Sequence, residues 1–426
     1  MQLSLILCTL GSNAAALASH LFSELRVVTS SGSLNGIYNN TEHTVRGFIG
    51  IPYAEPPVQE LRWAPPRPKS PPQSPIDASS FRSPCAQVYT YSNNSIWSVL
   101  PYNIWNSGDM SEDCLYLNIW APSAKHRGYG GLRKAAVMMF IHGGSYSTGA
   151  ASVAYYDGTN LVHNHNDIIV VTINYRLNVF GFPNAPGIDL SKQNLGLLDQ
   201  VDLESRLAIE WVHNNIARFG GDPDRILLFG QSAGASSADI HAYAYPDNPL
   251  VSALALHSGT APLLATAPDH QNWNELSTAV GCGTGTESFQ CMSQVPTMKI
   301  VETRAHGSYN FYPIQDNILV FSDYAARAKM GKLARLPTLA GITEREYTAI
   351  VPLSLTSIDE KLEKAIYELG ERSFNCPLRE SVRIRIDQHV PIWRYVYYGN
   401  FTNLSPTPWL GAYHGGKKYR SLFLFA

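Results

Sequence analysis

The stretch Ile226-Leu227-Leu228-Phe229-Gly230-Gln231-Ser232-Ala233-Gly234 carries an apolar run directly into a serine that stands between two glycines. The apolar run predicts a buried strand, and the residues from about Ala233 onward predict a helix. A strand that turns sharply into a helix lifts the serine hydroxyl out of the top of the sheet. Glycine is needed on both sides because a Cβ would crowd so tight a bend. The pattern indicates a nucleophile elbow, with Ser232 as the candidate nucleophile.

Continuous apolar runs elsewhere indicate a sheet that is buried on both faces. Ala135–Ile141 and Ile168–Ile173 are apolar almost throughout, which is typical of parallel strands between two layers of helices. Residues 207–216 repeat at helical spacing and end at the helix stop Phe219-Gly220-Gly221-Asp222-Pro223. Strands and helices that alternate without an internal repeat predict one doubly wound α/β domain with a mostly parallel sheet. Further core strands are expected at residues 253–256, 336–340 and 392–398.

The amino-terminal part is expected to be more irregular than this core. Val27, Val28 and Ile37 predict a short amino-terminal sheet that ends near residues 48–53. Residues 55–76 contain many prolines and few regular periods, so we expect an ordered excursion over the surface.

Composition and the first residues bear on partners and location. The 426 residues carry a formal net charge of −2 without a long single-sign run, which gives no electrostatic reason to expect nucleic acid or an acidic membrane as a partner. Residues 1–18 predict a secretory signal peptide, because a short apolar core is followed by the small-x-small site Ala16-Leu17-Ala18. Residues 19–426 are then a single secreted domain, and no other segment approaches the roughly 18 apolar residues of a membrane span.

The cysteines and the sequons agree with an oxidising compartment. Once Cys8 leaves with the signal, Cys85 and Cys114 flank one irregular stretch and Cys282 and Cys291 flank a short loop, and both pairs suit disulfides. Cys376 is then left over, and we expect a buried thiol. The spacings do not fit zinc, and we expect neither a metal nor a cofactor. Glycosylation sequons begin at Asn39, Asn93, Asn400 and Asn403.

A serine nucleophile needs a base and an acid that orients the base. His414 follows the last predicted strand, in a loop long enough to fold over the top of the sheet, and it comes after both serine and acid in the chain. His257, which follows the strand at 253–256, is its rival. For the acid, Glu344 and Glu346 both follow the strand at 336–340, and position alone does not separate them.

Backbone amides near a second strand end can hold a developing negative charge. The strand at 135–141 runs into His142-Gly143-Gly144-Ser145, where glycine lets N–H groups point at an oxyanion without obstruction by side chains. The amide of Ala233, directly after the nucleophile, would supply a further donor.

Several motifs taken together resemble the type-B carboxylesterase/lipase family, which includes cholinesterases and secreted fungal esterases. They are FIGIPYA at 48–54, SEDCLYLN at 111–118, INYR at 173–176, NLG at 194–196 with LDQ at 198–200, FGGDP at 219–223 and GQSAG at 230–234. The likeness extends from about residue 25 to residue 416 and implies an α/β-hydrolase fold that cleaves carboxylic esters through an acyl-enzyme.

The resemblance also assigns residues. Ser232 matches the family's nucleophile and His414 its base, and counting from Gly341 favours Glu346 over Glu344 as the acid, although the family's following glycine is Tyr347 here. The oxyanion amides fall at Gly144, Ser145 and Ala233. The pairs Cys85–Cys114 and Cys282–Cys291 resemble the family's two loop disulfides. The implied partner is a small-molecule or lipid ester, and neither Trp97 nor Trp105 identifies it, since both are expected to pack the loop.

Three departures from the family leave alternatives open, the first being a short segment between Glu346 and His414 that is expected to lack helices that the family has over its acyl pocket. Residues 201–205 look like an insertion inside one helix, and the sequence after His414 lacks the family's closing helix, so the fold is expected to be truncated at its carboxyl end. The alternatives to an esterase are an inactive truncated gene product and a binding or adhesion protein on the same fold. The retention of both Ser232 and His414 argues for the enzyme.

Overall fold

The structure is a computed structural model that describes residues 24–88, 94–99, 110–127, 133–200, 207–263, 266–402 and 405–416. The predicted signal at 1–18, the candidate insertion at 201–205, Trp105 and the sequons at Asn93 and Asn403 lie outside these ranges. No helix in the described ranges is both long and apolar enough to cross a membrane.

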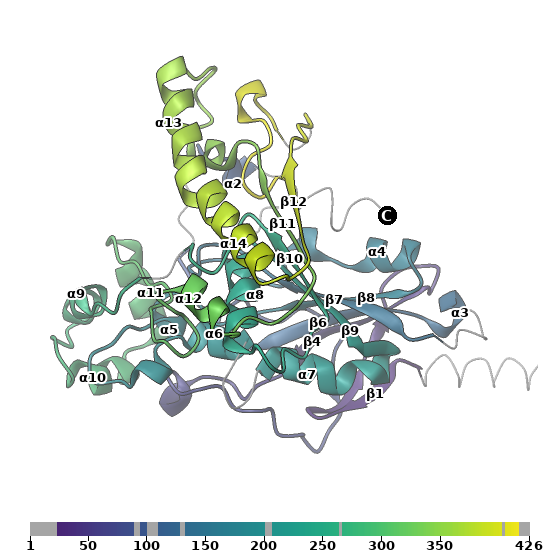
Figure 1. Ribbon diagram of the computed structural model, residues 1–426. Coiled ribbons are helices and arrows are strands. Elements are labelled where there is room, and N and C mark those ends of the chain that lie inside the picture. The colour runs from purple at the N-terminus through teal and green to yellow at the C-terminus, as the bar shows by residue number, and fades with distance from the viewer. Residues whose placement is uncertain are drawn as a thin grey trace, which may run out of the picture.

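A nine-stranded sheet forms the centre of the molecule, in the order β12-β11-β10-β9-β7-β8-β6-β4-β3 (Figure 1). Neighbouring strands are parallel from β12 to β8, and β6, β4 and β3 join antiparallel at one edge. This arrangement confirms the mostly parallel doubly wound sheet. The strands are β1 (Arg26–Thr29), β2 (Gly32–Asn35), β3 (Ile37–Tyr38), β4 (Val45–Pro52), β5 (Ile76–Asp77), β6 (Tyr116–Pro122), β7 (Ala135–Ile141), β8 (Ile168–Ile173), β9 (Gly221–Gln231), β10 (Ala253–His257), β11 (Thr338–Thr343) and β12 (Ile392–Tyr397).

Helices cover both faces of the sheet. Side chains of α7 and α8 belong to the larger apolar cluster, and Val162 of α4 belongs to the smaller cluster on the other face. The helices are α2 (Ile96–Val99), α3 (Ala124–Arg127), α4 (Thr159–Asn164), α5 (Asn178–Gly181), α6 (Leu195–Gln200), α7 (Leu207–Asn215), α8 (Ala233–Ala244), α9 (Gln271–Ala279), α10 (Ser288–Gln294), α11 (Thr297–Ala305), α12 (Tyr324–Lys329), α13 (Glu360–Gly370) and α14 (Cys376–Asp387), the last two joined by a π-helical stretch at Glu371–Asn375.

The strand β7 shows why the central strands are apolar throughout. Val137, Met139 and Ile141 point into the larger cluster, while Phe140 points into the smaller one. Successive side chains of a strand face opposite sides, so a strand between two helical layers needs apolar residues at every position. The sequence prediction for this strand matches its observed bounds.

The amino-terminal prediction was partly wrong. Val27 and Val28 lie in a separate three-stranded sheet of β1, β2 and β5, as expected for a small sheet. Ile37 and residues 45–52 instead belong to the main sheet, where β4 pairs antiparallel with β6. Pairing between strands this far apart in the chain leaves no local signal that could reveal which sheet a strand joins.

Candidate active site

Ser232 lies at a sharp turn between β9 and α8, as the elbow pattern predicts. Its φ of 58° and ψ of −125° are strained for a residue with a side chain. A Cβ at Gly230 would lie 2.3 Å from the backbone of Gly234, and a Cβ at Gly234 would lie 2.0 Å from the carbonyl oxygen of Ile141. Both flanking glycines are therefore required by close backbone approach, and the Ser232 amide donates to the His257 carbonyl at 2.8 Å.

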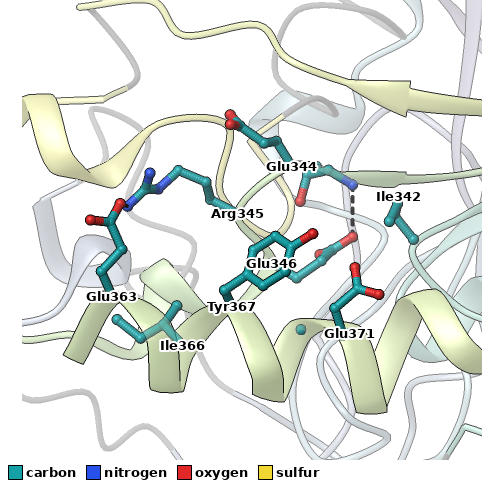
Figure 2. Close-up of a pocket in the computed structure, with 10 residues that line it drawn as sticks. Ile342, Glu344, Arg345, Glu346, Glu363, Ile366, Tyr367 and Glu371 are labelled. Carbon is teal, nitrogen blue, oxygen red and sulfur yellow. Dashed lines mark hydrogen bonds and ion pairs between the residues drawn. The ribbon is translucent and has the colours of Figure 1, made fainter. Parts of the chain in front are cut away.

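The structure places Glu346, rather than Glu344, beside His414. The Glu346 Oε2 atom accepts from His414 Nδ1 at 2.5 Å, and its Oε1 accepts from the Thr343 amide at 2.8 Å. Glu346 is buried, whereas Glu344 is exposed and its carboxylate points away from Glu346 (Figure 2). A cavity of about 70 Å³ lies behind Glu346, lined also by Glu363 and Glu371.

His414 reaches the site on a loop that follows β12. The loop runs beside the residues after β11: the Arg345 amide donates to Ala412 O at 3.1 Å and Thr348 Oγ1 donates to Leu410 O at 2.7 Å. At the other side of the imidazole, His414 Nε2 lies 2.9 Å from the side-chain Nε2 of Gln231.

The rival histidine faces a different partner. The His257 Nδ1 atom forms a short hydrogen bond with the hydroxyl of Tyr395 on β12. Burial, together with the Glu346 carboxylate, raises the pKa of Tyr395 above its ordinary value, so this hydroxyl stays protonated. His257 thus belongs to a pair behind the nucleophile, and its backbone carbonyl supports the elbow.

The glycine turn after β7 opens toward Ser232. Gly144 has a φ of 120° and Ser145 a φ of 54°. A Cβ at Gly144 would lie 2.0 Å from Thr148 O, so this turn requires glycine there. Among the residues with described positions, the amides of Gly144, Ser145 and Ala233 donate no backbone hydrogen bond, so they are available to a ligand.

These residues line one cavity of about 550 Å³. Ser232, Glu346, His414, Gln231 and the turn at 143–145 all contribute to its wall. Apart from Glu346 and His414, the described residues that line the cavity carry no charge. Its aromatic lining residues are Trp97, Tyr156, Tyr312, Tyr347 and Phe374, so Trp97 faces the cavity as well as packing against Tyr413.

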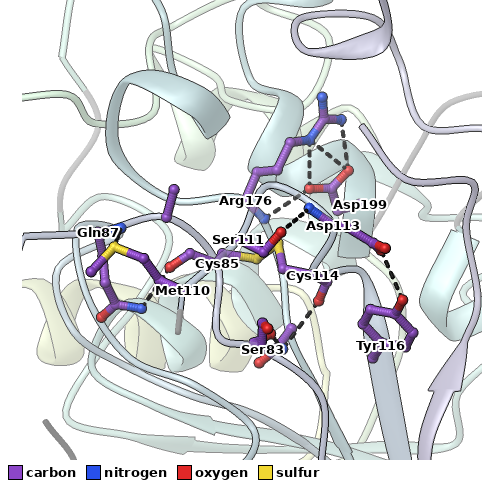
Figure 3. The surroundings of a disulfide bond; sticks show 12 residues. Ser83, Cys85, Gln87, Met110, Ser111, Asp113, Cys114, Tyr116, Arg176 and Asp199 are labelled. Atoms are coloured by element: carbon purple, nitrogen blue, oxygen red, sulfur yellow. Dashed lines mark hydrogen bonds and ion pairs between the residues drawn. A yellow bond between two sulfur atoms is a disulfide. The ribbon is translucent and has the colours of Figure 1, made fainter. Parts of the chain in front are cut away.

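A disulfide supports the wall of this cavity. Cys85 and Cys114 are bonded, as expected, and Gln87 lies two residues beyond Cys85 (Figure 3). The Gln87 side chain accepts from the Gly149 amide at 2.8 Å and donates to the Gly149 carbonyl at 2.9 Å. Gly149 lines the cavity, so the disulfide loop positions it through Gln87. Nothing in the sequence singled out Gln87, because its partner lies 62 positions away.

The other cysteine predictions have different outcomes. Cys282 and Cys291 form the second expected disulfide. The prediction of a buried thiol at Cys376 was wrong, because this residue is exposed at the start of α14. A polar helix has a solvent-facing side, and the apolar periodicity there was too weak to show which side Cys376 takes.

Of the described sequons, Asn400 is exposed, whereas the Asn39 side chain is half-buried and donates to Thr159 Oγ1.

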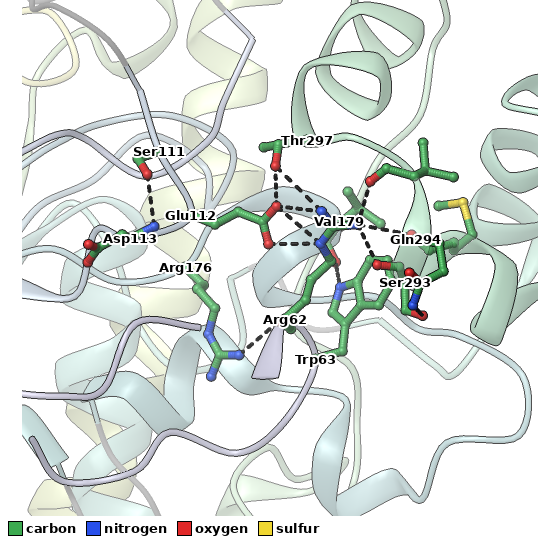
Figure 4. Close-up of polar contacts among 12 residues, drawn as sticks. Arg62, Trp63, Ser111, Glu112, Asp113, Arg176, Val179, Ser293, Gln294 and Thr297 are labelled. Carbon is green, nitrogen blue, oxygen red and sulfur yellow. Dashed lines mark hydrogen bonds and ion pairs between the residues drawn. The ribbon is translucent and has the colours of Figure 1, made fainter. Parts of the chain in front are cut away.

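Several charged residues of the quoted motifs form buried ion pairs away from the reacting groups. Arg176 pairs with Asp199 at 2.7 Å (Figure 3), and Arg62 pairs with Glu112 at 2.8 Å (Figure 4). The Arg62 guanidinium also donates to the Val295 carbonyl at 2.7 Å, which ties the proline-rich excursion to the turn between α10 and α11. Breaking such a buried pair costs about 3–5 kcal/mol, since the remaining charge is left uncompensated.

Comparison with known proteins defines the class of this chain. A family model described as the carboxylesterase family matches residues 23–368, and the chain belongs to that family. It is 39% identical over 401 residues to a chlorogenic acid esterase of Aspergillus niger, covering 92% of this chain and 76% of the relative. It is 34% identical over 424 residues to secreted lipase 5 of Gibberella zeae, covering 92% and 78%. An acetylcholinesterase of Bungarus fasciatus is 29% identical over 462 residues, covering 94% and 73%. The protein is a carboxylic ester hydrolase.

Proposed function

We propose that the protein hydrolyses carboxylic esters through an acyl-enzyme formed on Ser232, with His414 as the base and Glu346 as the orienting acid. The observation that carries this proposal is the 2.5 Å contact between Glu346 Oε2 and His414 Nδ1 in the cavity that Ser232 lines. This contact leaves the lone pair of His414 on Nε2, the nitrogen that faces the elbow.

The reaction proceeds in two halves. Ser232 Oγ attacks the ester carbonyl while its proton passes to His414 Nε2, and the imidazolium then returns that proton to the departing alcohol. Water attacks the acyl-enzyme in the same way, its proton passing through His414 to Ser232 as the acid is released. Glu346 keeps Nδ1–H oriented and stabilises the imidazolium in both halves.

The tetrahedral oxyanion in each half needs hydrogen-bond donors. The amides of Gly144, Ser145 and Ala233 can supply them, because no described backbone acceptor occupies them. Ala233 is the first residue of the 12-residue helix α8, so the positive end of the helix dipole adds to the stabilisation.

The cavity favours neutral esters with an aromatic or apolar group. Its aromatic residues offer flat apolar contact, and the one lining carboxylate among the described residues, Glu346, is already paired with His414. The similarity to a chlorogenic acid esterase supports an aromatic acyl group. We expect a neutral aryl-acyl ester to be cleaved with a higher kcat/KM than the choline ester of the same acid, and the reverse order would contradict this substrate class.

We also propose that the protein is secreted after removal of residues 1–18, which the similarity to a secreted lipase supports. Amino-terminal sequencing of protein from the culture medium should then begin at Ser19. Retention of the protein in the cell with residues 1–18 intact would contradict this.

The test of the mechanism is covalent labelling with a fluorophosphonate followed by peptide mapping. We expect the label on Ser232 and expect Ser232→Ala to lose both labelling and turnover. Ser236→Ala is the matched control, since Ser236 lies one turn further along α8 and its buried hydroxyl has no hydrogen-bond partner among the described residues. A label on another serine would move the nucleophile away from Ser232, and no label on a folded chain would overturn the proposal in favour of a binding protein.

A further inference from the structure

Gln231 is placed to act on the same imidazole that Ser232 needs. It is the last residue of β9, is 1% exposed, and pairs in register with His257 of β10. Its side-chain Nε2 lies 2.9 Å from His414 Nε2, whereas the Ser232 hydroxyl makes no hydrogen bond to any described residue. In the resting geometry the partner of the base is therefore Gln231 and not the nucleophile.

The chemistry of this contact sets the direction of the hydrogen bond. Two nitrogens at 2.9 Å attract only when one donates and the other accepts, and His414 Nδ1–H is already given to Glu346. The Gln231 amide therefore donates to the lone pair of His414 Nε2. Glu346 and Gln231 together hold the neutral imidazole in one tautomer from its two sides.

The neighbouring turn is shaped around this side chain. A Cβ at Gly143 would lie 2.8 Å from Gln231 Oε1 and 2.9 Å from the Ser232 Cβ. Only a residue without a side chain leaves room here for the Gln231 amide and the nucleophile together. The Gln231 carboxamide is thus enclosed between the oxyanion turn and the base.

We propose that Gln231 is a positioning residue that serves His414 in both of its protonation states; this inference rests on the proposed function. Its N–H holds the neutral imidazole in the resting enzyme and yields Nε2 when Ser232 Oγ–H donates during attack. Once the imidazolium forms, a half-turn of the Gln231 carboxamide exchanges its N–H for its carbonyl oxygen, which can accept from Nε2–H until the proton passes to the leaving group. A carboxamide can do both, whereas a carboxylate at this position could only accept and would stabilise the imidazolium more strongly.

The test compares Gln231→Glu and Gln231→Met across the pH profile of kcat/KM. An opposite charge within hydrogen-bond reach moves an ionisation by about one to three pH units. We expect Gln231→Glu to move the acidic limb of the profile upward by about one unit or more, with a roughly tenfold loss on that limb and a smaller loss above it. Gln231→Met should leave the limb in place and lower kcat about tenfold with little change in KM, because the imidazole is less well positioned.

Gln290→Glu is the matched control, since it adds the same charge on the exposed side of α10 and should leave the limb in place. A Gln231→Glu profile that superimposes on that of the unaltered enzyme, or Gln231→Met with full kcat, would overturn the proposal while Ser232→Ala remained inactive. Should Gln231→Glu fail to fold, the nitrogen NMR spectrum of the unaltered full chain decides. It should show His414 with its proton on Nδ1, and a proton on Nε2 at neutral pH would overturn the proposal.

Discussion

The nucleophile and the base of the candidate site are held in different ways. Ser232 lies between two central elements, and its backbone is enclosed: a Cβ on Gly259 would lie 2.2 Å from Ser232 O. His414 lies on a loop after the edge strand β12, whose exposed residues include Trp393 at 60%. The loop contacts the β11 side through an isolated bridge between Arg345 and Tyr413 and a small set of hydrogen bonds.

This difference predicts where changes will affect the enzyme. The elbow lies between central elements whose backbones approach closely, so a disturbance there should lower the stability of the whole domain. The His414 loop follows an edge strand and is anchored by Leu410 and Tyr413 in the smaller apolar cluster, so we expect it to open locally before the central elbow does. A disturbance there should lower activity before it lowers stability.

The largest expected effect comes from the acid that anchors this loop. Glu346→Gln removes the charge that holds His414 Nδ1–H and stabilises the imidazolium, so we expect kcat to fall about 10⁴-fold. The exposed Glu344→Gln should stay within about twofold of the unaltered enzyme. Steady-state kinetics on both variants measures this, and a greater loss from Glu344→Gln would show that Glu346 is not the orienting acid.

The elbow side is tested by Gly234→Ala. The added Cβ would meet the carbonyl oxygen of Ile141, which is backbone of a central strand and cannot move aside. We expect the free energy of unfolding to fall by about 3 kcal/mol or more, measured by chemical denaturation.

Gly331→Ala separates this clash from the general cost of replacing a glycine. Gly331 has a φ of 75°, and a Cβ at this position would meet no atom within 4 Å, so only the backbone conformation penalises alanine. A loss of about 1 kcal/mol is expected there. Equal losses at the two positions would show that the elbow is not specially enclosed.

The same contrast explains what the sequence could predict. The elbow and the strand Ala135–Ile141 are specified locally, by glycines at a bend and by apolar residues at every position, and both lie where predicted. The order of residues placed His414 near the acid, and family counting favoured Glu346, but the choice against Glu344 became visible only when side-chain direction and burial were known.

The contacts that the sequence missed all join distant positions. Gln231 was visible inside the elbow motif, yet its contact with His414 spans 183 positions and depends on how the last loop folds back. Cys376 was misplaced because the solvent-facing side of α14 is set by what packs against it. Such contacts depend on tertiary packing, which residue patterns within one element do not encode.

The smallest expected effect tests the His414 loop by itself. Thr348 is fully buried, and its hydroxyl is shared between Leu410 O at 2.7 Å, four positions before the base, and Arg345 O at 2.8 Å. Thr348→Val keeps the shape of the side chain but removes this hydrogen bond, worth about 1–1.4 kcal/mol, so we expect kcat to fall about fivefold to tenfold.

Thr303→Val on the surface of α11 is the control, because Thr303 Oγ1 also donates to a backbone carbonyl but lies far along the chain from the site. If the loop is the weakly held region, Thr348→Val should lose activity while its midpoint of thermal unfolding stays close to that of the Thr303→Val variant. A clear drop in that midpoint with unchanged kcat would show instead that the loop is as firmly built into the core as the elbow.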